Sequence, residues 1–306
     1  MEDVKQAQSR LDNIRTVEPI LGALRTISLG SWRAALKRRD GVRRYEERLR
    51  AMLPSLLSHI QPNPRRRLLA GWRTGRKTPQ TPVHIAVLVI GSERGLCGRF
   101  NAAVVRHAER YLAELSADGV QVELMALGTR VGRIFRQRQQ PLAWSGALSV
   151  TALPSYRLAF DLTRRWLARY EEHDLNAVDL VYNAYRGTAR YEPAVVRLIP
   201  PQLPSVGQAG YLPPEPWPPP IIETDPLSLY VRVVEQWTAV SVYGLLLESA
   251  AAEHSARFQL LERATQNTER IIAELTLAVQ AARQQAITRE MQDLAAGAGL
   301  IGTRPD

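Results

Sequence analysis

The sequence predicts an α plus α/β fold, in which long N- and C-terminal helices form an antiparallel coiled coil and the central α/β domain holds a mainly parallel sheet. Two observations predict it. Both ends of the chain carry apolar residues at helical spacing, and the segment between them alternates short apolar strands with amphipathic helices. The helical ends are too long to be buried in one compact domain, so we expect them to pair with each other.

The first segment, residues 1–60, is expected to be the N-terminal coiled-coil helix, because residues 4–52 favour helix throughout. Pro19 should kink or locally unwind this helix, and Pro54 should end it. Residues 61–82 follow as a basic linker. The apolar stripe of the helix consists of Leu11, Ile14, Val17, Leu21, Leu24 and Ile27.

The α/β domain is expected over residues 83–200. Its first strand, 83–90, is a nearly continuous apolar run, which is typical of a strand that is covered on both faces. Strands that alternate with helices predict a mainly parallel sheet with right-handed crossovers. Further strands are expected at 121–127, 177–185 and 191–199, and helices at 100–115, 130–137 and 154–172.

A proline-rich connector, 201–224, leads to the C-terminal helix, 225–306. Asp225 is a suitable N-cap and Pro226 suits the first helical position. A helix from there to about residue 299 would be roughly 110 Å long. Its apolar positions step by four and three residues, as in a coiled-coil seam. These positions are Leu247, Ala251, His254, Phe258, Leu261, Thr265, Thr268, Ile272, Leu275, Val279, Ala282 and Ala286.

Composition restricts the function classes. The single cysteine, Cys97, excludes an intrachain disulfide and a multi-cysteine metal site, and the histidines show no metal-ligand spacing. No cofactor or metal is therefore expected. No apolar stretch reaches the ~18 residues that a membrane span needs, and no signal peptide is recognised at the start of the sequence, so we expect an intracellular or peripheral protein.

The net charge of +10 raises the hypothesis of a basic coiled-coil adaptor or a nucleic-acid binder. Arginines cluster in the N-terminal part of the chain, but no recognised DNA or RNA module and no interleaved stacking aromatics accompany them. A solvated or partner-facing helix surface is the favoured use of this charge, and no nucleic-acid partner is expected.

The turn over residues 91–98 is the one segment that resembles a catalytic motif. Cys97 in a strand-to-helix turn could act as a nucleophile, and the same turn could hold a phosphate, as in an α/β enzyme or a nucleotide-binding protein. The spacing matches neither the dinucleotide fingerprint nor the P-loop, and the turn has no lysine. A structural turn, with Gly95 and Gly98 for its geometry and Cys97 as a small buried side chain, is the favoured interpretation.

Residues 89–101, VIGSERGLCGRFN, resemble the "DRGLCGGLN" segment of the γ subunit of F-type ATP synthases. Three C-terminal segments resemble that family independently: ESAAAEHSAR at 248–257, ATQN at 264–267 and ARQQAITRE at 282–290. Their order and separation also agree, and the resemblance covers essentially the whole chain.

This resemblance implies the central rotor shaft of an F1Fo ATP synthase, a subunit without bond chemistry of its own. The shaft would couple ion flow through the membrane c-ring to ATP synthesis or hydrolysis at the catalytic sites of the α and β subunits. The implied partners are the α, β and ε subunits and the c-ring. The implied location is peripheral, on the cytoplasmic face of the cell inner membrane.

The resemblance also implies residue roles. Arg283 and Gln284 would grip an acidic loop of a β subunit, with Thr288 and Glu290 nearby, while the shaft seam would include Leu21, Leu24, Ile272, Leu275, Val279 and Ala282. Two lysines that are usual in the family's N-terminal helix are Pro19 and Gly22 here, and Arg25 is a candidate to replace part of that charge. These departures fit a divergent branch, such as an alternative ATPase of its host.

Overall fold

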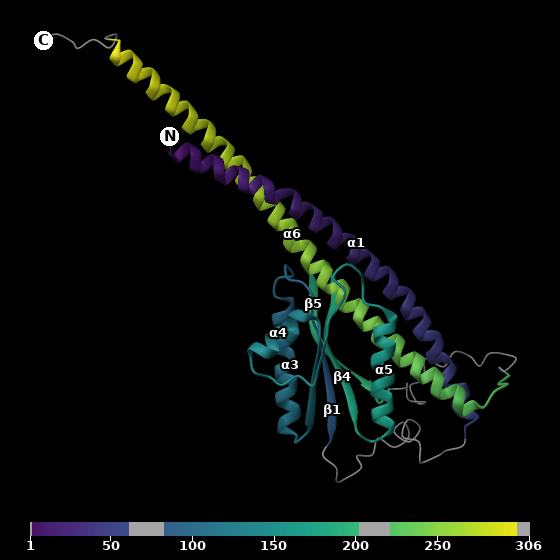
Figure 1. The fold of residues 1–306 in the computed structure, drawn as a ribbon. Coiled ribbons are helices and arrows are strands. Elements are labelled where there is room, and N and C mark those ends of the chain that lie inside the picture. Colours follow the sequence, from purple (N-terminus) through teal and green to yellow (C-terminus); the bar gives the residue numbers. More distant parts are fainter. Residues whose placement is uncertain (1, 61–82, 202–220, 299–306) are drawn as a thin grey trace. The chain divides into compact units, whose positions relative to one another are not determined.

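The computed structural model describes residues 2–60, 83–201 and 221–298, so the predicted linker and most of the predicted connector lie outside the described residues (Figure 1). The chain divides into two compact units. One joins its two ends, Met1–Ile27 with Phe258–Asp306, and the other is Ser28–Arg257.

Helix α1 spans Glu2–Ser58 without a break, so the local unwinding expected at Pro19 does not occur. A proline lacks one N–H donor and crowds the preceding turn, but α1 remains helical on both sides of Pro19. The helix also continues past Pro54, where it was expected to end. Leu53 and Leu56 are buried in the core of the second unit, and this packing stabilises the last turn despite the proline.

Helix α6 spans Pro226–Gly297, close to the predicted limits. Its start has the predicted cap, because the backbone N–H of Ser228 donates to Asp225 Oδ2 over 2.8 Å and the Ser228 hydroxyl donates to the same oxygen over 2.6 Å. The capping carboxylate satisfies one of the backbone donors that a helix leaves unpaired at its first turn.

A five-stranded sheet has the order β3-β2-β1-β4-β5. The neighbours from β3 to β4 are parallel, as predicted, and the edge strand β5 is antiparallel to β4. The sequence missed β3 because three residues are too few to show a strand pattern. The strands are β1 (His84–Ile90), β2 (Gln121–Leu127), β3 (Trp144–Gly146), β4 (Ala177–Gly187) and β5 (Arg190–Ile199).

Strand β1 is buried on both faces, as its continuous apolar sequence predicted. One face of the sheet packs with α5 (Tyr156–Glu171), the end of α1 and the start of α6. The other face packs with α3 (Phe100–Ala117) and α4 (Thr129–Gln137). Figure 1 shows this layering of helices on both sides of the sheet. The second unit is therefore an α/β core that incorporates parts of both long helices.

Candidate functional site

The two ends of the chain form an antiparallel helix pair. Arg25 Nη1 of α1 lies 2.9 Å from Glu262 Oε2 of α6, and Arg283 Nη2 of α6 donates to Gln8 Oε1 of α1 over 3.1 Å. Since the residue numbers fall along α1 as they rise along α6, the two helices run in opposite directions.

The α6 side of this pair follows the predicted seam. Within the first unit, Leu261, Thr265 and Val279 are buried, and the remaining predicted positions are half-buried. These half-buried positions are Phe258, Thr268, Ile272, Leu275, Ala282 and Ala286. Residues at steps of four and three return to one helix face, and this face is the least exposed one.

The α1 side follows its predicted stripe only in part. Leu11 is buried, and Ile14, Leu21 and Leu24 are half-buried. Val17 and Ile27 were wrongly placed on this stripe, because they are 47% and 63% exposed. Glu18 and Arg25 are half-buried in their place, and the apolar stem of a long charged side chain can cover a seam while its head group remains at the surface.

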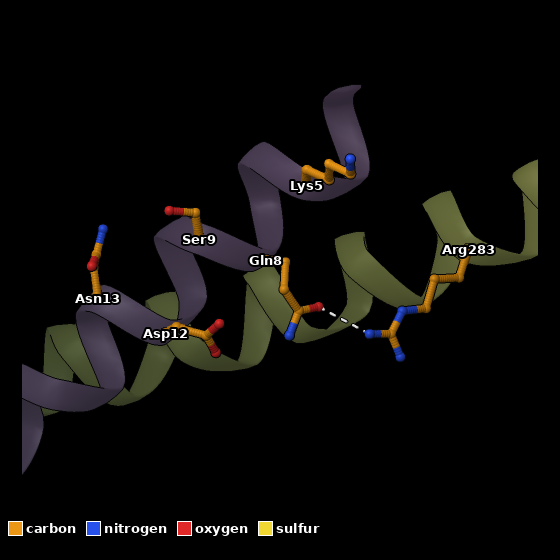
Figure 2. A pocket seen from close by; sticks show the side chains of 6 residues that line it. All are labelled: Lys5, Gln8, Ser9, Asp12, Asn13 and Arg283. Carbon is orange, nitrogen blue, oxygen red and sulfur yellow. Dashed lines mark hydrogen bonds between the residues drawn. The ribbon is translucent and has the colours of Figure 1, made fainter. Parts of the chain in front are cut away.

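A polar groove lies on this helix pair, with a cavity volume of about 450 Å³. Figure 2 shows Arg283 reaching from α6 towards Gln8 on α1, with the other lining side chains along α1. The lining residues are Lys5, Gln8, Ser9, Asp12, Asn13 and Arg283. The sequence analysis had assigned no role to the α1 residues of this groove; the signal that could have found them is the antiparallel register, which places the first turns of α1 beside Arg283.

Arg283 is exposed, and its hydrogen-bond partner is the neutral amide of Gln8. Within the described ranges, no carboxylate forms an ion pair with it. A guanidinium has five N–H donors, so the charge and most of the donors of Arg283 are available to a partner.

The other three residues of the implied grip are also exposed, but they do not form one cluster with Arg283. Thr288 donates its hydroxyl hydrogen to the backbone oxygen of Gln284 over 2.8 Å, within its own helix. Helical spacing places Arg283 and Glu290 on one face, and Gln284 and Thr288 on a neighbouring face.

Hydrogen bonds between Ser92 and Asn101 stabilise the turn over residues 91–98. The backbone N–H of Ser92 donates to Asn101 Oδ1 over 2.9 Å, and Asn101 Nδ2 donates to Ser92 Oγ over 2.7 Å. Gly98 has a φ of +60°, which favours glycine. Gly95 has another reason for being small, because a Cβ there would lie 3.2 Å from Arg130 Nη2.

Cys97 is 3% exposed and packs with Phe100 and Ala252. Burial raises the pKa of its thiol, although the hydrogen bond between Cys97 and Ser92 acts in the opposite direction. A nucleophilic cysteine needs a lowered pKa and access to substrate. The environment of Cys97 therefore favours a structural role over catalysis.

Two residues of α6 that the sequence analysis left without a role hold this turn. Arg257 donates from Nε to the backbone oxygen of Gly95 over 3.2 Å and from Nη2 to that of Arg94 over 3.3 Å. Its Nη2 also lies 2.5 Å from Glu253 Oε1 in a pair that is about nine-tenths buried on both sides. A charged pair four residues apart in a stretch of small residues is the signal that could have revealed them.

Burial shifts the pKa values of Glu253 and His254, which lie beside Arg257. It raises the pKa of Glu253, although Arg257 opposes this shift. It also lowers the pKa of the neighbouring His254 to about 4, with a further contribution from the positive charge of Arg257. His254 is therefore neutral at pH 7.

No helix in the described part of the chain has an apolar stretch long enough to cross a bilayer. Over residues 2–60, 83–201 and 221–298, no group of three His, Cys, Asp or Glu residues lies close enough together to hold a metal ion.

Comparisons with known proteins agree along almost the whole chain. The family profile described as ATP synthase matches residues 3–299. The ATP synthase gamma chain of Rubrobacter xylanophilus is 32% identical over 98% of this chain and 99% of its own length, and that of Syntrophus aciditrophicus is 27% identical over 97% and 98%. A chain of the Euglena gracilis mitochondrial ATP synthase has a TM-score of 0.58 at 16% identity, covering 99% of this chain and 98% of that one. A chain of the Tetrahymena thermophila central stalk and c-ring has a TM-score of 0.54 at 18% identity, covering 80% and 99%.

Proposed function

This chain belongs to the ATP synthase gamma chain family, and from that premise we propose that it works as the rotor shaft that couples ion flow through a c-ring to ATP synthesis or hydrolysis. The gamma chain is a non-catalytic subunit, so its contribution is mechanical. Its rotation would present different faces to the catalytic sites of the α and β subunits in turn.

The observation that carries this proposal is the antiparallel pair formed by the two chain ends. The seam residues of α6 face α1 and are buried or half-buried, so each helix braces the other against bending. The predicted seam residues Leu21, Leu24, Ile272, Leu275, Val279 and Ala282 would hold the pair together. Two paired helices resist twisting better than a single helix, as torque transmission requires.

Arg283 is the proposed grip of this shaft on an acidic loop of a β subunit, with contributions from Gln284, Thr288 and Glu290. Its exposed guanidinium is held by a neutral amide, so a partner carboxylate can replace or supplement that contact. Such a charge-assisted bond is strong enough to orient the partner. It can also break and form again with the next β subunit, because both groups are rehydrated in between.

The proposed partners are the α, β and ε subunits and the c-ring, and the proposed position is peripheral, on the cytoplasmic face of the cell inner membrane. Two of the similar solved chains come from ATP synthase assemblies that include a c-ring, which supports this set of partners. In this proposal residues 1–60 and 225–306 form the shaft, residues 83–200 form the globular foot, and residues 61–82 and 201–224 connect them.

Co-expression with the α and β subunits tests the proposal. We expect a complex with one copy of this chain for three of each partner, and ATP hydrolysis that drives ion pumping after the c-ring is added. Arg283→Ala should lower the number of ions pumped per ATP hydrolysed while the helix content of the isolated chain stays unchanged. Wild-type coupling in that variant would contradict the role of Arg283, and failure to assemble with α and β would contradict the rotor itself.

Arg263→Ala is the matched control. Arg263 is an exposed arginine on the same helix, twenty residues away, and it lies outside the proposed grip and the groove in Figure 2. Its substitution removes the same charge from α6 and should leave coupling unchanged. An equal loss in both variants would indicate a general effect of helix charge.

A further inference from the structure

A second groove lies within the unit Ser28–Arg257, between α1, α5 and α6, with a cavity volume of about 470 Å³. We call it the tyrosine groove. It is lined by Lys37, Arg38, Gly41, Val42 and Tyr45 of α1, Tyr156 of α5, and Gln236, Val240 and Tyr243 of α6. This volume is within the range of sites that hold a side chain or a small ligand. None of its residues belongs to the helix pair that carries Arg283.

The walls of the tyrosine groove are aromatic. The rings of Tyr156 and Tyr243 meet edge to face, with their centroids 5.8 Å apart, and Tyr45 is 49% exposed. Tyr156 donates its hydroxyl hydrogen to Gln236 Oε1 over 2.7 Å, which fixes both side chains. Rigid aromatic surfaces of this kind bind an apolar or aromatic anchor at a low entropic cost.

The polar side chains beside these aromatic walls can donate hydrogen bonds. The side-chain oxygen of Gln236 accepts from Tyr156, and its amide N–H groups have no hydrogen-bond partner among the described residues. Lys37 and Arg38 are exposed and have no ion pair within the described ranges. The groove thus offers an amide donor and two cations beside an aromatic slot, a combination that suits a peptide backbone with carboxylate side chains.

The charge of the surrounding helix favours an acidic occupant. Residues 33–50 of α1 carry eight cations (Arg33, Lys37, Arg38, Arg39, Arg43, Arg44, Arg48 and Arg50) against three carboxylates (Asp40, Glu46 and Glu47). All three carboxylates are already engaged, Asp40 by Arg39, Glu47 by Arg43 and Glu46 by the Ser241 hydroxyl. The excess positive charge is left for a partner outside the chain.

Gly41 keeps the tyrosine groove open. A Cβ at this position would meet nothing within 4 Å, so the free space continues to the backbone of α1. Glycine inside a helix costs about 1 kcal/mol relative to alanine. A side chain larger than alanine at this position would extend into the groove.

We propose that the tyrosine groove is a docking site for an acidic segment of another subunit of the same complex, with one aromatic or branched aliphatic side chain between the tyrosines and carboxylates on Lys37 and Arg38. The proposal rests on the chain being a subunit of an ATP synthase, and it assigns a contact separate from the Arg283 grip. A small anion would leave the aromatic walls unfilled, and the vesicle measurement below separates a peptide from an anionic lipid.

Cross-linking in the assembled complex tests this proposal. Tyr45 is replaced by p-benzoylphenylalanine, the purified complex is irradiated, and the cross-linked peptides are sequenced. We expect an adduct with a segment of another subunit in which at least two Asp or Glu residues lie within four positions of an aromatic or branched residue. An adduct with a neutral or basic segment, an adduct with lipid, or no adduct would overturn the proposal.

Binding to the full-length chain gives an independent measurement. The probe is a fluorescein-labelled peptide, Glu-Asp-Phe-Asp-Glu, and anisotropy reports its affinity at low salt. The double variant Lys37→Glu/Arg38→Glu should bind about tenfold more weakly, because two exposed ion pairs are replaced by repulsions. Gly41→Leu fills the groove without changing any charge, and it should weaken binding to a similar extent.

The matched control is Arg133→Glu, which reverses an exposed charge of α4, outside both the tyrosine groove and the basic stretch 33–50. It should bind the peptide within twofold of the wild type. Equal weakening in all variants, unchanged binding in Gly41→Leu, or tighter binding to phosphatidylglycerol vesicles than to the peptide would each overturn the proposal. Co-purification of Gly41→Leu with α and β at the wild-type yield would show that the rotor assignment stands independently of this result.

Discussion

Arg25 and Glu262, which are 237 residues apart in the chain, form an ion pair of 2.9 Å between the first and last helices. The resemblance to γ subunits had suggested Arg25 as a substitute for lysines that this chain lacks. The structure gives that charge a specific partner within the chain itself. This ion pair and the Arg283–Gln8 hydrogen bond connect the two helices at two separate points of the first unit.

We predict a small, salt-dependent coupling between Arg25 and Glu262. Both side chains are about one-third exposed, so solvent screens much of their attraction. A double-mutant cycle with Arg25→Ala and Glu262→Ala should give about 0.5–1 kcal/mol, measured by urea unfolding with circular dichroism. The coupling should fall by at least half in 1 M NaCl. A coupling that stays constant in salt would contradict an ionic interaction.

The second prediction concerns Arg257. Its removal leaves the Glu253 carboxylate buried without its cation and frees the backbone oxygens of Arg94 and Gly95. Arg257→Ala should lower the free energy of unfolding by about 3–5 kcal/mol. The double variant Arg257→Met/Glu253→Leu, which removes both charges, should recover most of this loss. If the single and double variants were equally unstable, packing and not charge would explain the effect.

His254 makes stability depend on pH. Its pKa is lowered from 6.5 to about 4 in the fold, so the unfolded chain binds the proton more tightly. Stability should therefore be complete above pH 6.5 and should fall as the pH drops towards about 4, by about 2–3 kcal/mol at pH 4.5. Glu253, whose pKa is raised, acts in the opposite direction in acid. The comparison of wild type with His254→Gln by urea unfolding from pH 4.5 to 8 isolates the histidine contribution, and parallel curves would contradict it.

Glycine substitutions should have opposite effects in two places. At Gly22, inside α1, a Cβ would meet nothing within 4 Å, so Gly22→Ala should stabilise the chain by about 1 kcal/mol. At Gly91, a Cβ would lie 1.9 Å from Val131 Cγ2, so Gly91→Ala should destabilise it by about 1–3 kcal/mol. Thermal unfolding of both variants measures this, and a loss of stability at Gly22 would indicate that another subunit or helix needs the space there.

The apolar stripe predicted on α1 shows a limit to predicting a buried helix face from sequence periodicity. Val17 and Ile27 fit helical spacing, yet both are exposed, while Glu18 and Arg25 are half-buried. An apolar stripe on one helix can be drawn through either of two adjacent faces, and only the position of the partner helix selects between them. The predicted seam positions of α6 in the first unit are buried or half-buried, and their pattern extends over many more residues.

Local sequence patterns were also insufficient for Pro19, Pro54 and the turn over residues 91–98. The conformational limits of proline predicted a kink or local unwinding at Pro19 and an end at Pro54, but α1 is helical through both positions, and the buried Leu53 and Leu56 stabilise its last turns. Residues 91–98 form a turn between β1 and α3. The Glu253–Arg257 pair is visible in the sequence, but the backbone oxygens that Arg257 binds lie about 160 residues away, and no local pattern identifies them.

The sequence alone determined the two long helices, the parallel strands and the family, because these depend on local periodicity, capping and short motifs that the chain carries along its length. Only the tertiary structure decided which faces meet, which side chain neutralises which charge, and where grooves remain open. Those features depend on contacts between residues that are distant in the chain, and the free energy of such contacts comes from burial and geometry that no local pattern contains.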